Sequence, residues 1–132
     1  MGLMDKLFKS QREIAKDEIK GISWEPLESV DQLHNLVKNS NLKTKVIFKH
    51  STRCGISRMA LSSFEKNYEN LDQNAAYYLL DLLNYRDVST AIAEELNVQH
   101  QSPQVIVLKD EKVIHTESHH GIDINKIQSL IK

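Results

Sequence analysis

The order of apolar and polar residues along the chain predicts strands that alternate with helices. Residues 45–50 (KVIFKH) and 76–83 (AYYLLDLL) are short runs rich in β-branched, aromatic and other apolar residues, which are typical of buried strands. Around them, residues 29–40, 55–70 and 86–98 repeat apolar residues at the three- and four-residue spacing of amphipathic helices. Strands and helices that alternate in this way indicate a parallel sheet covered by helices.

The C-terminal part of the chain adds an antiparallel unit to this pattern. Residues 103–118 alternate apolar and polar positions over two strands, which are joined by a turn at residues 109–112. A closing helix begins after Asp123, whose side chain can cap it, and a short extended segment at residues 22–27 opens the series. The order βαβαβαββα is that of a thioredoxin-like fold, in which helices flank a central mixed sheet.

The helical spacing also predicts which side chains are buried. In the helix of residues 55–70, the expected buried face consists of Ile56, Met59, Ala60, Phe64 and Tyr68. In the closing helix it consists of Ile124, Ile127, Leu130 and Ile131.

Residues 1–21 stand apart from this pattern because they are rich in lysine and carry only a short apolar face. We expect an N-terminal amphipathic helical extension at residues 1–21 and a single thioredoxin-like domain at residues 22–132. The extension can pack on the domain, dock on a partner or a membrane surface, or be disordered. A chain of 132 residues is long enough for one domain with a single hydrophobic core.

The composition excludes several classes of function. The formal net charge of -1 gives no electrostatic footprint for nucleic acid. No apolar run reaches the roughly 20 residues that span a bilayer, and the N-terminus lacks a secretory signal, so we expect a cytoplasmic protein. The chain has six histidines, but none is spaced with the cysteine as in a structural zinc motif, so we expect no metal.

The chain has one cysteine, Cys54, in the stretch HSTRCGIS between the predicted strand and the predicted helix. Backbone N–H groups at a helix start lack helical partners, and the helix dipole is positive there, so this place favours a thiolate. Arg53 adds positive charge beside the sulfur, and Arg58 and Lys49 can add more. The alternative is that Cys54 is a small buried apolar residue, which the polar and basic residues around it disfavour.

A dithiol mechanism is excluded because the residue three positions after Cys54 is Ser57. Any redox cycle must therefore pass through a mixed disulfide with another molecule. Ser57 can donate a hydrogen bond to the thiolate, or it can simply be a polar residue of the first helical turn. Further along, Pro103 stands at a strand start, where a cis peptide bond after Ser102 is possible.

Three stretches together resemble the monothiol bacilliredoxins, the YtxJ-type proteins of the bacillithiol system: IFKHSTRCGIS, QSPQVIVL and ESHHGID. The resemblance covers roughly residues 22–132. The usual active-site stretch of that family is T-C-P-I-S, from which Arg53 and Gly55 depart. Glycine in place of proline makes the first helical turn looser, and arginine in place of a neutral residue adds charge beside the sulfur.

The resemblance implies a thiol-transfer reaction on bacillithiolated proteins, with Cys54 as the catalytic thiol, stabilised by Arg53, Gly55 and Ser57. Bacillithiol, a cysteine-containing thiol with a sugar and a malate, would be the co-substrate. The implied substrate-binding residues are Lys49, Ser102, Pro103, His119, Gly121 and Asp123. Two alternatives stay open: a non-catalytic redox-sensing module that is thiolated at Cys54, and a monothiol glutaredoxin that uses glutathione.

Overall fold

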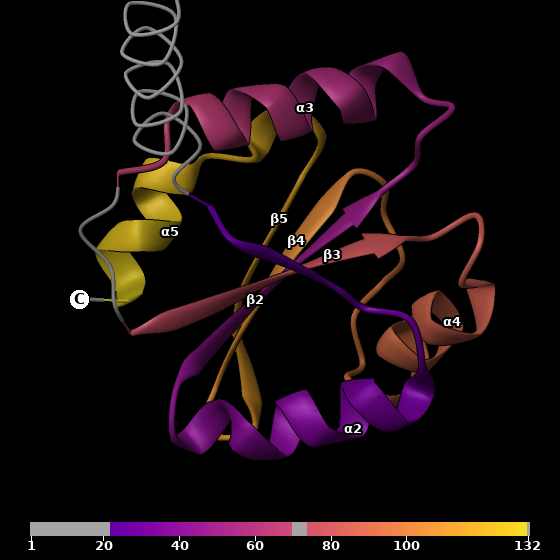
Figure 1. The fold of residues 1–132 in the computed structure, drawn as a ribbon, viewed down its shortest axis with the longest axis vertical. Helices are drawn as coiled ribbons and strands as arrows, with labels where there is room; N and C mark the ends of the chain where they lie inside the picture. The colour runs from indigo at the N-terminus through magenta and orange to yellow at the C-terminus, as the bar shows by residue number, and fades with distance from the viewer. Residues whose placement is uncertain (1–21, 70–73, 132) are drawn as a thin grey trace, which may run out of the picture.

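The computed structural model describes residues 22–69 and 74–131. The expected extension at residues 1–21 lies outside this part of the chain. The described residues form a five-stranded sheet with the strand order β1-β3-β2-β4-β5; Figure 1 labels β2, β3, β4 and β5 of this sheet. The strands are β1 Trp24–Pro26, β2 Thr44–His50, β3 Ala75–Asp81, β4 Gln104–Lys109 and β5 Lys112–Ser118. β3 pairs in parallel with both β1 and β2, whereas β4 is antiparallel to β2 and β5 is antiparallel to β4.

Four helices and two short 3₁₀ turns complete the described part of the chain (Figure 1). They are α2 Val30–Lys38, η1 Asn39–Asn41, α3 Gly55–Lys66, α4 Arg86–Glu95, η2 His119–Gly121 and α5 Ile124–Ile131. Side chains of α3 and α5 share one core cluster, and those of α2 and α4 share the other, so each pair of helices covers one face of the sheet. The predicted mixed sheet with flanking helices is confirmed.

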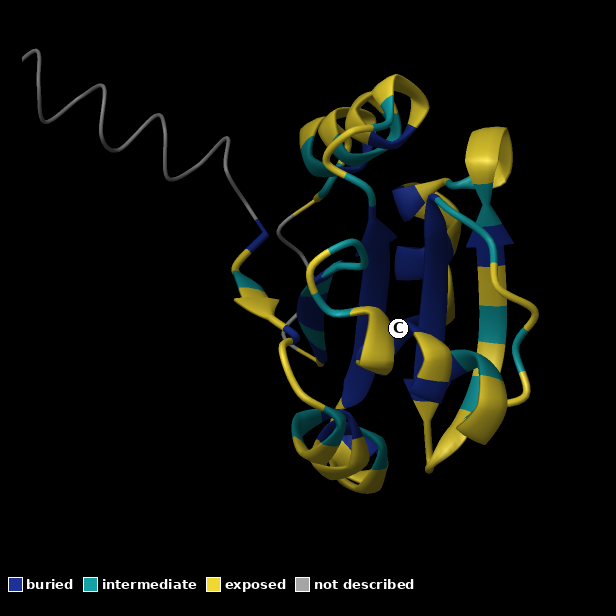
Figure 2. Ribbon diagram, turned by 90° about the vertical axis from the view of Figure 1, so that its right-hand side faces the viewer, coloured by how far each residue is buried: buried dark blue, intermediate teal, exposed yellow. Residues whose placement is uncertain are grey.

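Strand β2 lies at the centre of the fold, and all seven of its residues are buried. Figure 2 shows this layering, with buried strands in the middle and exposed residues on the outer sides of the helices. Because side chains alternate along a strand, Val46 and Phe48 enter the core under α3, while Ile47 enters the core under α2 and α4. His50 follows Phe48 on the α3 face, and Lys49 points to the opposite face.

Aromatic rings fill the core under α3. The ring centroids of Phe48 and Phe64 are 5.3 Å apart, and those of Trp24 and Phe64 are 5.8 Å apart. Trp24 also donates a hydrogen bond of 3.0 Å from Nε1 to Glu65 on α3. Aromatic contacts of this kind add to the free energy of burial, so they fix the last turn of α3 against the sheet.

The residues at two helix starts and at the hairpin turn adopt the local structure that the sequence predicts. Ser29 Oγ accepts a hydrogen bond of 3.0 Å from the N–H of Gln32, which is the capping contact expected for α2. Asp123 Oδ1 accepts one of 3.0 Å from the N–H of Asn125 and so caps α5. Between β4 and β5, Asp110 and Glu111 both have positive φ, as a two-residue hairpin turn requires.

Two expectations about burial are wrong. Ile56 and Met59 are 50% and 74% exposed on α3, and Leu130 is 40% exposed on α5. On α3 the buried residues are Phe64, as expected, and Ser57, which was not expected. The helix is rotated in this way because the Ser57 hydroxyl satisfies buried polar groups at the end of β2, which an apolar side chain there would leave unpaired.

Candidate active site

Cys54 is the N-cap residue of α3 and is partly exposed. Its backbone is extended (φ -101°, ψ 121°), its N–H donates to Ser51 at 3.1 Å, and its carbonyl accepts from Arg58 at 3.0 Å. Among the described residues, none forms a capping hydrogen bond with its Sγ. The sulfur therefore lies at the positive end of the helix dipole and is not used in a capping hydrogen bond, which suits an attacking thiolate.

Strand β4 brings Pro103 to the same end of the sheet. Gln104 pairs with Lys49 across the β2–β4 ladder, so Pro103 lies just beyond this pair, beside the end of β2 that leads to Cys54. The Ser102–Pro103 peptide bond is cis, which confirms the expectation for this position. Ser102 Oγ is buried and has no hydrogen-bond partner among the described residues.

The last 3₁₀ turn closes the site from a third side. The N–H of His119 donates a hydrogen bond of 3.1 Å to the carbonyl of Pro103. A groove of about 220 Å³ runs between this turn and α3. It is lined by Ile56, Met59, Ala60, Ser63, His119, His120 and Ile122. The α3 side of the groove is largely apolar, and the η2 side carries two imidazoles.

Sequence reasoning missed Ile56 and Met59 as part of this site because it assigned them to the core. It also missed His120, although His120 adjoins the predicted His119. Gly121 is exposed, and a side chain added there would meet no atom within 4 Å. Asp123 uses Oδ1 for its cap contact with Asn125. Neither Gly121 nor Asp123 is among the residues that line the groove.

Ser57 has partners other than the sulfur. Its Oγ lies 2.7 Å from His50 Nδ1 and accepts a hydrogen bond of 3.0 Å from the N–H of Ser51. Burial is the main cause that lowers the pKa of His50, which favours the neutral form of the imidazole. Strand alternation could have identified His50, because it places His50 on the same face of the sheet as α3.

Lys49 does not lie where the sequence analysis expected it. Its side chain is 0% exposed, and its Nζ contacts His100 Nδ1 at 2.7 Å and Gln104 Oε1 at 3.0 Å. Burial lowers its pKa from 10.5 to about 8. Since Lys49 points to the face opposite His50 and α3, it is not available at the surface to bind the carboxylates of a ligand.

The two residues that flank Cys54 are exposed. Arg53 therefore carries an exposed positive charge on the residue that precedes Cys54. Gly55 is the first residue of α3, and a Cβ added there would meet only Arg58 Nη2, at 3.9 Å. The local backbone thus has room for a side chain at this position.

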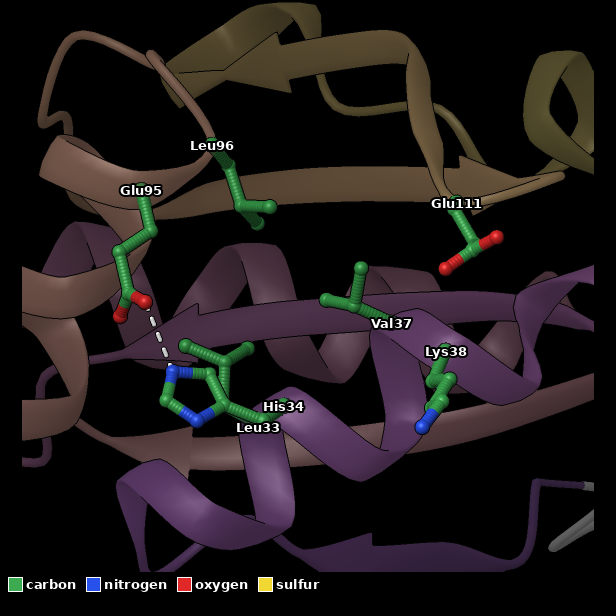
Figure 3. A pocket seen from close by; sticks show the side chains of 7 residues that line it. All are labelled: Leu33, His34, Val37, Lys38, Glu95, Leu96 and Glu111. Carbon is green, nitrogen blue, oxygen red and sulfur yellow. Dashed lines mark hydrogen bonds and ion pairs between the residues drawn. The ribbon is translucent and has the colours of Figure 1, made fainter.

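A second pocket, of about 320 Å³, lies on the other face of the sheet between α2, the end of α4 and the β4–β5 turn (Figure 3). His34 Nε2 and Glu95 Oε1 approach to 2.7 Å across it, while Leu33, Val37 and Leu96 form its apolar floor. Because α2 and α4 cover the face opposite α3, this pocket is separate from Cys54.

The described residues hold neither a cluster of metal ligands nor a membrane-spanning helix. No three His, Cys, Asp or Glu side chains within residues 22–69 and 74–131 gather closely enough to hold a metal ion. No helix in the same part of the chain is both long and apolar enough to cross a bilayer.

A mixed five-stranded sheet, a cysteine at the start of the helix after β2 and a cis-proline before β4 define a thioredoxin-fold protein with a single thiol at that helix start. Residues 25–127 match the family model described as monothiol bacilliredoxin BrxC. The chain therefore belongs to the monothiol bacilliredoxin family, as its active-site stretches indicated.

Solved structures agree on the fold. A protein described as a candidate oxidoreductase with a thioredoxin fold is 27% identical, with a TM-score of 0.71 over 83% of this chain and 94% of that one. Thioredoxin from Malassezia sympodialis is 25% identical, with a TM-score of 0.63 over 83% and 88% of the two chains. Thioredoxin from Trypanosoma brucei brucei is 20% identical, with a TM-score of 0.65 over 83% and 91%.

Proposed function

We propose that this protein is a thiol–disulfide oxidoreductase that removes bacillithiol from mixed disulfides on oxidised proteins. The observation that carries the proposal is the position of the chain's single cysteine. Cys54 is partly exposed at the N-cap of α3, next to the strand end that carries Pro103. Membership of the monothiol bacilliredoxin family supports bacillithiol as the co-substrate.

The reaction has two exchange steps. In the first, the Cys54 thiolate attacks the bacillithiol sulfur of the mixed disulfide, the target's S–S bond breaks, and the target leaves as a thiolate that takes up a proton. In the second, the thiolate of another bacillithiol attacks the same bacillithiol sulfur, now bonded to Cys54. Cys54 leaves as a thiolate and bacillithiol disulfide is released, so each target thiol restored consumes one free bacillithiol.

The residues around the groove suit this substrate. Bacillithiol is anionic through its malate, and the exposed Arg53 guanidinium next to the sulfur can bind a carboxylate with two hydrogen bonds. His119 and His120 line the η2 side of the groove, opposite α3, where they would face a bound ligand. The backbone of Ser102 would align the disulfide against Cys54. A free thiol of this kind functions in a reducing compartment, so we place the reaction in the cytoplasm.

A mass-spectrometric turnover assay tests the proposal. The reduced protein and a Cys54→Ser control are mixed with a target that carries a bacillithiol mixed disulfide, with and without excess bacillithiol. We expect the target to lose its cap, Cys54 to gain it, and several targets to be restored per Cys54 when bacillithiol is present. The Cys54→Ser variant should leave the cap in place.

The same assay separates the alternatives. A redox-sensing module would accept one cap per Cys54 and then stop, even in excess bacillithiol. A glutathione-using enzyme would turn over faster on a glutathione mixed disulfide with excess glutathione than on the bacillithiol pair. A target that keeps its cap with the wild-type protein would refute the exchange mechanism.

A further inference from the structure

His50 is connected to the active-site helix through one hydroxyl group. It is the last residue of β2 and is 7% exposed, and its Nδ1 lies 2.7 Å from Ser57 Oγ. Ser57 is 0% exposed and belongs to the first turn of the helix that Cys54 caps. A buried imidazole is therefore in direct contact with the side chain three positions after the cysteine.

The direction of the Ser57 hydroxyl proton depends on the protonation state of His50. Ser51 N–H donates to Ser57 Oγ at 3.0 Å and occupies one acceptor site. When His50 is neutral with its proton on Nε2, the Ser57 hydroxyl donates to Nδ1 and keeps one lone pair free. When His50 carries a proton on Nδ1, it donates to Ser57, and the hydroxyl hydrogen becomes free to point elsewhere.

We propose that His50 is a positioning residue that takes the proton of Cys54 through the hydroxyl of Ser57. In this step the thiol proton moves to Ser57 Oγ, and the hydroxyl proton of Ser57 moves to His50 Nδ1. The products are a thiolate and an imidazolium, and the number of protons does not change. Ser57 then donates a hydrogen bond to the thiolate. The inference rests on the proposed function only in taking Cys54 as the reactive thiol.

The helix start brings the two groups within reach of each other. Cys54 is the N-cap and Ser57 is the third residue of α3, a spacing of three residues that places neighbouring side chains on one side of a helix. Rotation of the Cys54 side chain would turn Sγ toward Ser57. Hydrogen bonds used in catalysis commonly tighten only when substrate is present, so an open sulfur at rest is compatible with the step.

The charges around His50 favour both ends of this transfer. Burial lowers the pKa of His50 and keeps it an acceptor at rest. Asp81, its ladder partner on β3, and Glu65 on α3 favour the imidazolium once it forms, whereas Arg58 on α3 opposes it. Asp81 Oδ1 is buried and has no hydrogen-bond partner among the described residues, while its Oδ2 accepts a hydrogen bond of 2.7 Å from Asn84 Nδ2. On the β4 side, the chain next to His50 is Pro103, which carries no charge.

The pH profile of Cys54 alkylation tests the proposal in the full chain. Iodoacetamide is neutral and reacts with the thiolate, so its rate constant follows the thiolate population from pH 4 to pH 10. A cysteine that shares a proton with His50 gives two steps with a plateau between them, because the pair titrates as a unit. We expect the wild type to show this plateau.

Two variants should remove the plateau. His50→Asn can still bond to Ser57 but does not titrate near neutral pH, and Ser57→Ala removes the bridge. We expect the alkylation profile of each variant to show a single step. At pH 6 each variant should react roughly tenfold more slowly than wild type, because its thiolate population is about ten times smaller. Matched controls are His34→Asn, an exposed histidine on the opposite face, and Ser62→Ala, an exposed serine on α3. Both should keep the wild-type profile.

A measurement on the wild-type chain covers the case in which a variant fails to fold. The NMR titration of His50 is recorded before and after Cys54 is blocked with a methylthio group, which is neutral. Because the thiolate favours the imidazolium, we expect the His50 midpoint to move to lower pH on blocking. An unchanged midpoint, or a single-step alkylation profile in the wild type, would overturn the proposal.

This test is independent of the proposed function. Iodoacetamide requires neither bacillithiol nor a target protein, so the two-step profile can appear even if debacillithiolation fails. Conversely, the wild type could turn over a bacillithiolated target and still show a single-step alkylation profile. That result would support the proposed function and refute the role of His50.

Discussion

Replacement of Lys49 by methionine gives a direct measure of what its buried ammonium does to stability. Lys49→Met keeps the unbranched stem in the core but removes the charge. The structure places Nζ against His100 Nδ1 and Gln104 Oε1, and no carboxylate among the described residues forms an ion pair with it. The charged form of the wild-type side chain is therefore desolvated without a counter-ion.

The magnitude follows from the pKa of Lys49, which burial lowers from 10.5 to about 8. Between these values the unfolded chain keeps a proton that the folded chain has released, so the free energy of unfolding of the wild type rises with pH. At about 1.4 kcal/mol per pKa unit, this rise amounts to about 2.5 kcal/mol by pH 10. Below pH 8 both states are protonated, and Lys49 contributes no slope.

At pH 7 two effects of Lys49→Met oppose each other. The variant loses two hydrogen bonds from a charged donor, each contributing about 1.5–3 kcal/mol, but it no longer desolvates an ammonium. We expect the two proteins to agree within about 1 kcal/mol at pH 7. By pH 10 the wild type should have gained about 2.5 kcal/mol over the variant.

Urea unfolding of both proteins at pH 7, 8, 9 and 10 measures this difference. The difference between the two proteins cancels the other groups that titrate at alkaline pH. Lys109→Met, at an exposed position on β4, controls for the removal of a lysine charge. A wild-type-minus-variant difference that stays constant within about 0.5 kcal/mol from pH 7 to pH 10 would refute the reasoning.

Three further substitutions test the packing and the helix ends. Phe64→Ala opens the aromatic core under α3 and should lower the free energy of unfolding by about 3–5 kcal/mol in urea; a loss below 1.5 would contradict the packing described. Asp123→Ala removes the cap contact with Asn125 and should cost about 1 kcal/mol, with Asp123→Ser as a capping control that restores most of it. Gly55→Pro should raise the free energy of unfolding by about 0.4–1 kcal/mol, since proline suits the first helical residue; a decrease would show that this turn needs glycine.

The strands and helices could be predicted from the sequence because each carries a local signal. The β-branched run of β2 excludes a helix, and Ser29 and Asp123 mark two helix starts with side chains that bond to the backbone. Cys54 could be placed at the start of α3 for the same reason, because the pattern changes from strand to helix at that residue.

The faces of the elements could not all be predicted, because tertiary contacts decide them. Helical spacing alone favours Ile56 and Met59 as core residues, but the bond between Ser57 and His50 turns that side of α3 to solvent. Lys49 looks like a surface residue by composition, yet β2 is buried on both faces, so its position in the strand forces it inward. Only the pairing of β2 with β4 shows that Gln104 can receive its ammonium group.

Trp24, the only tryptophan in the chain, is a natural fluorophore that contacts helix α3. Its indole stacks on Phe64 and donates to Glu65, two residues of the helix that begins at Cys54. A shift of α3 when Cys54 acquires a bacillithiol cap would change the solvation of the indole and hence its emission. Stopped-flow fluorescence could therefore follow single turnovers in real time without an added label.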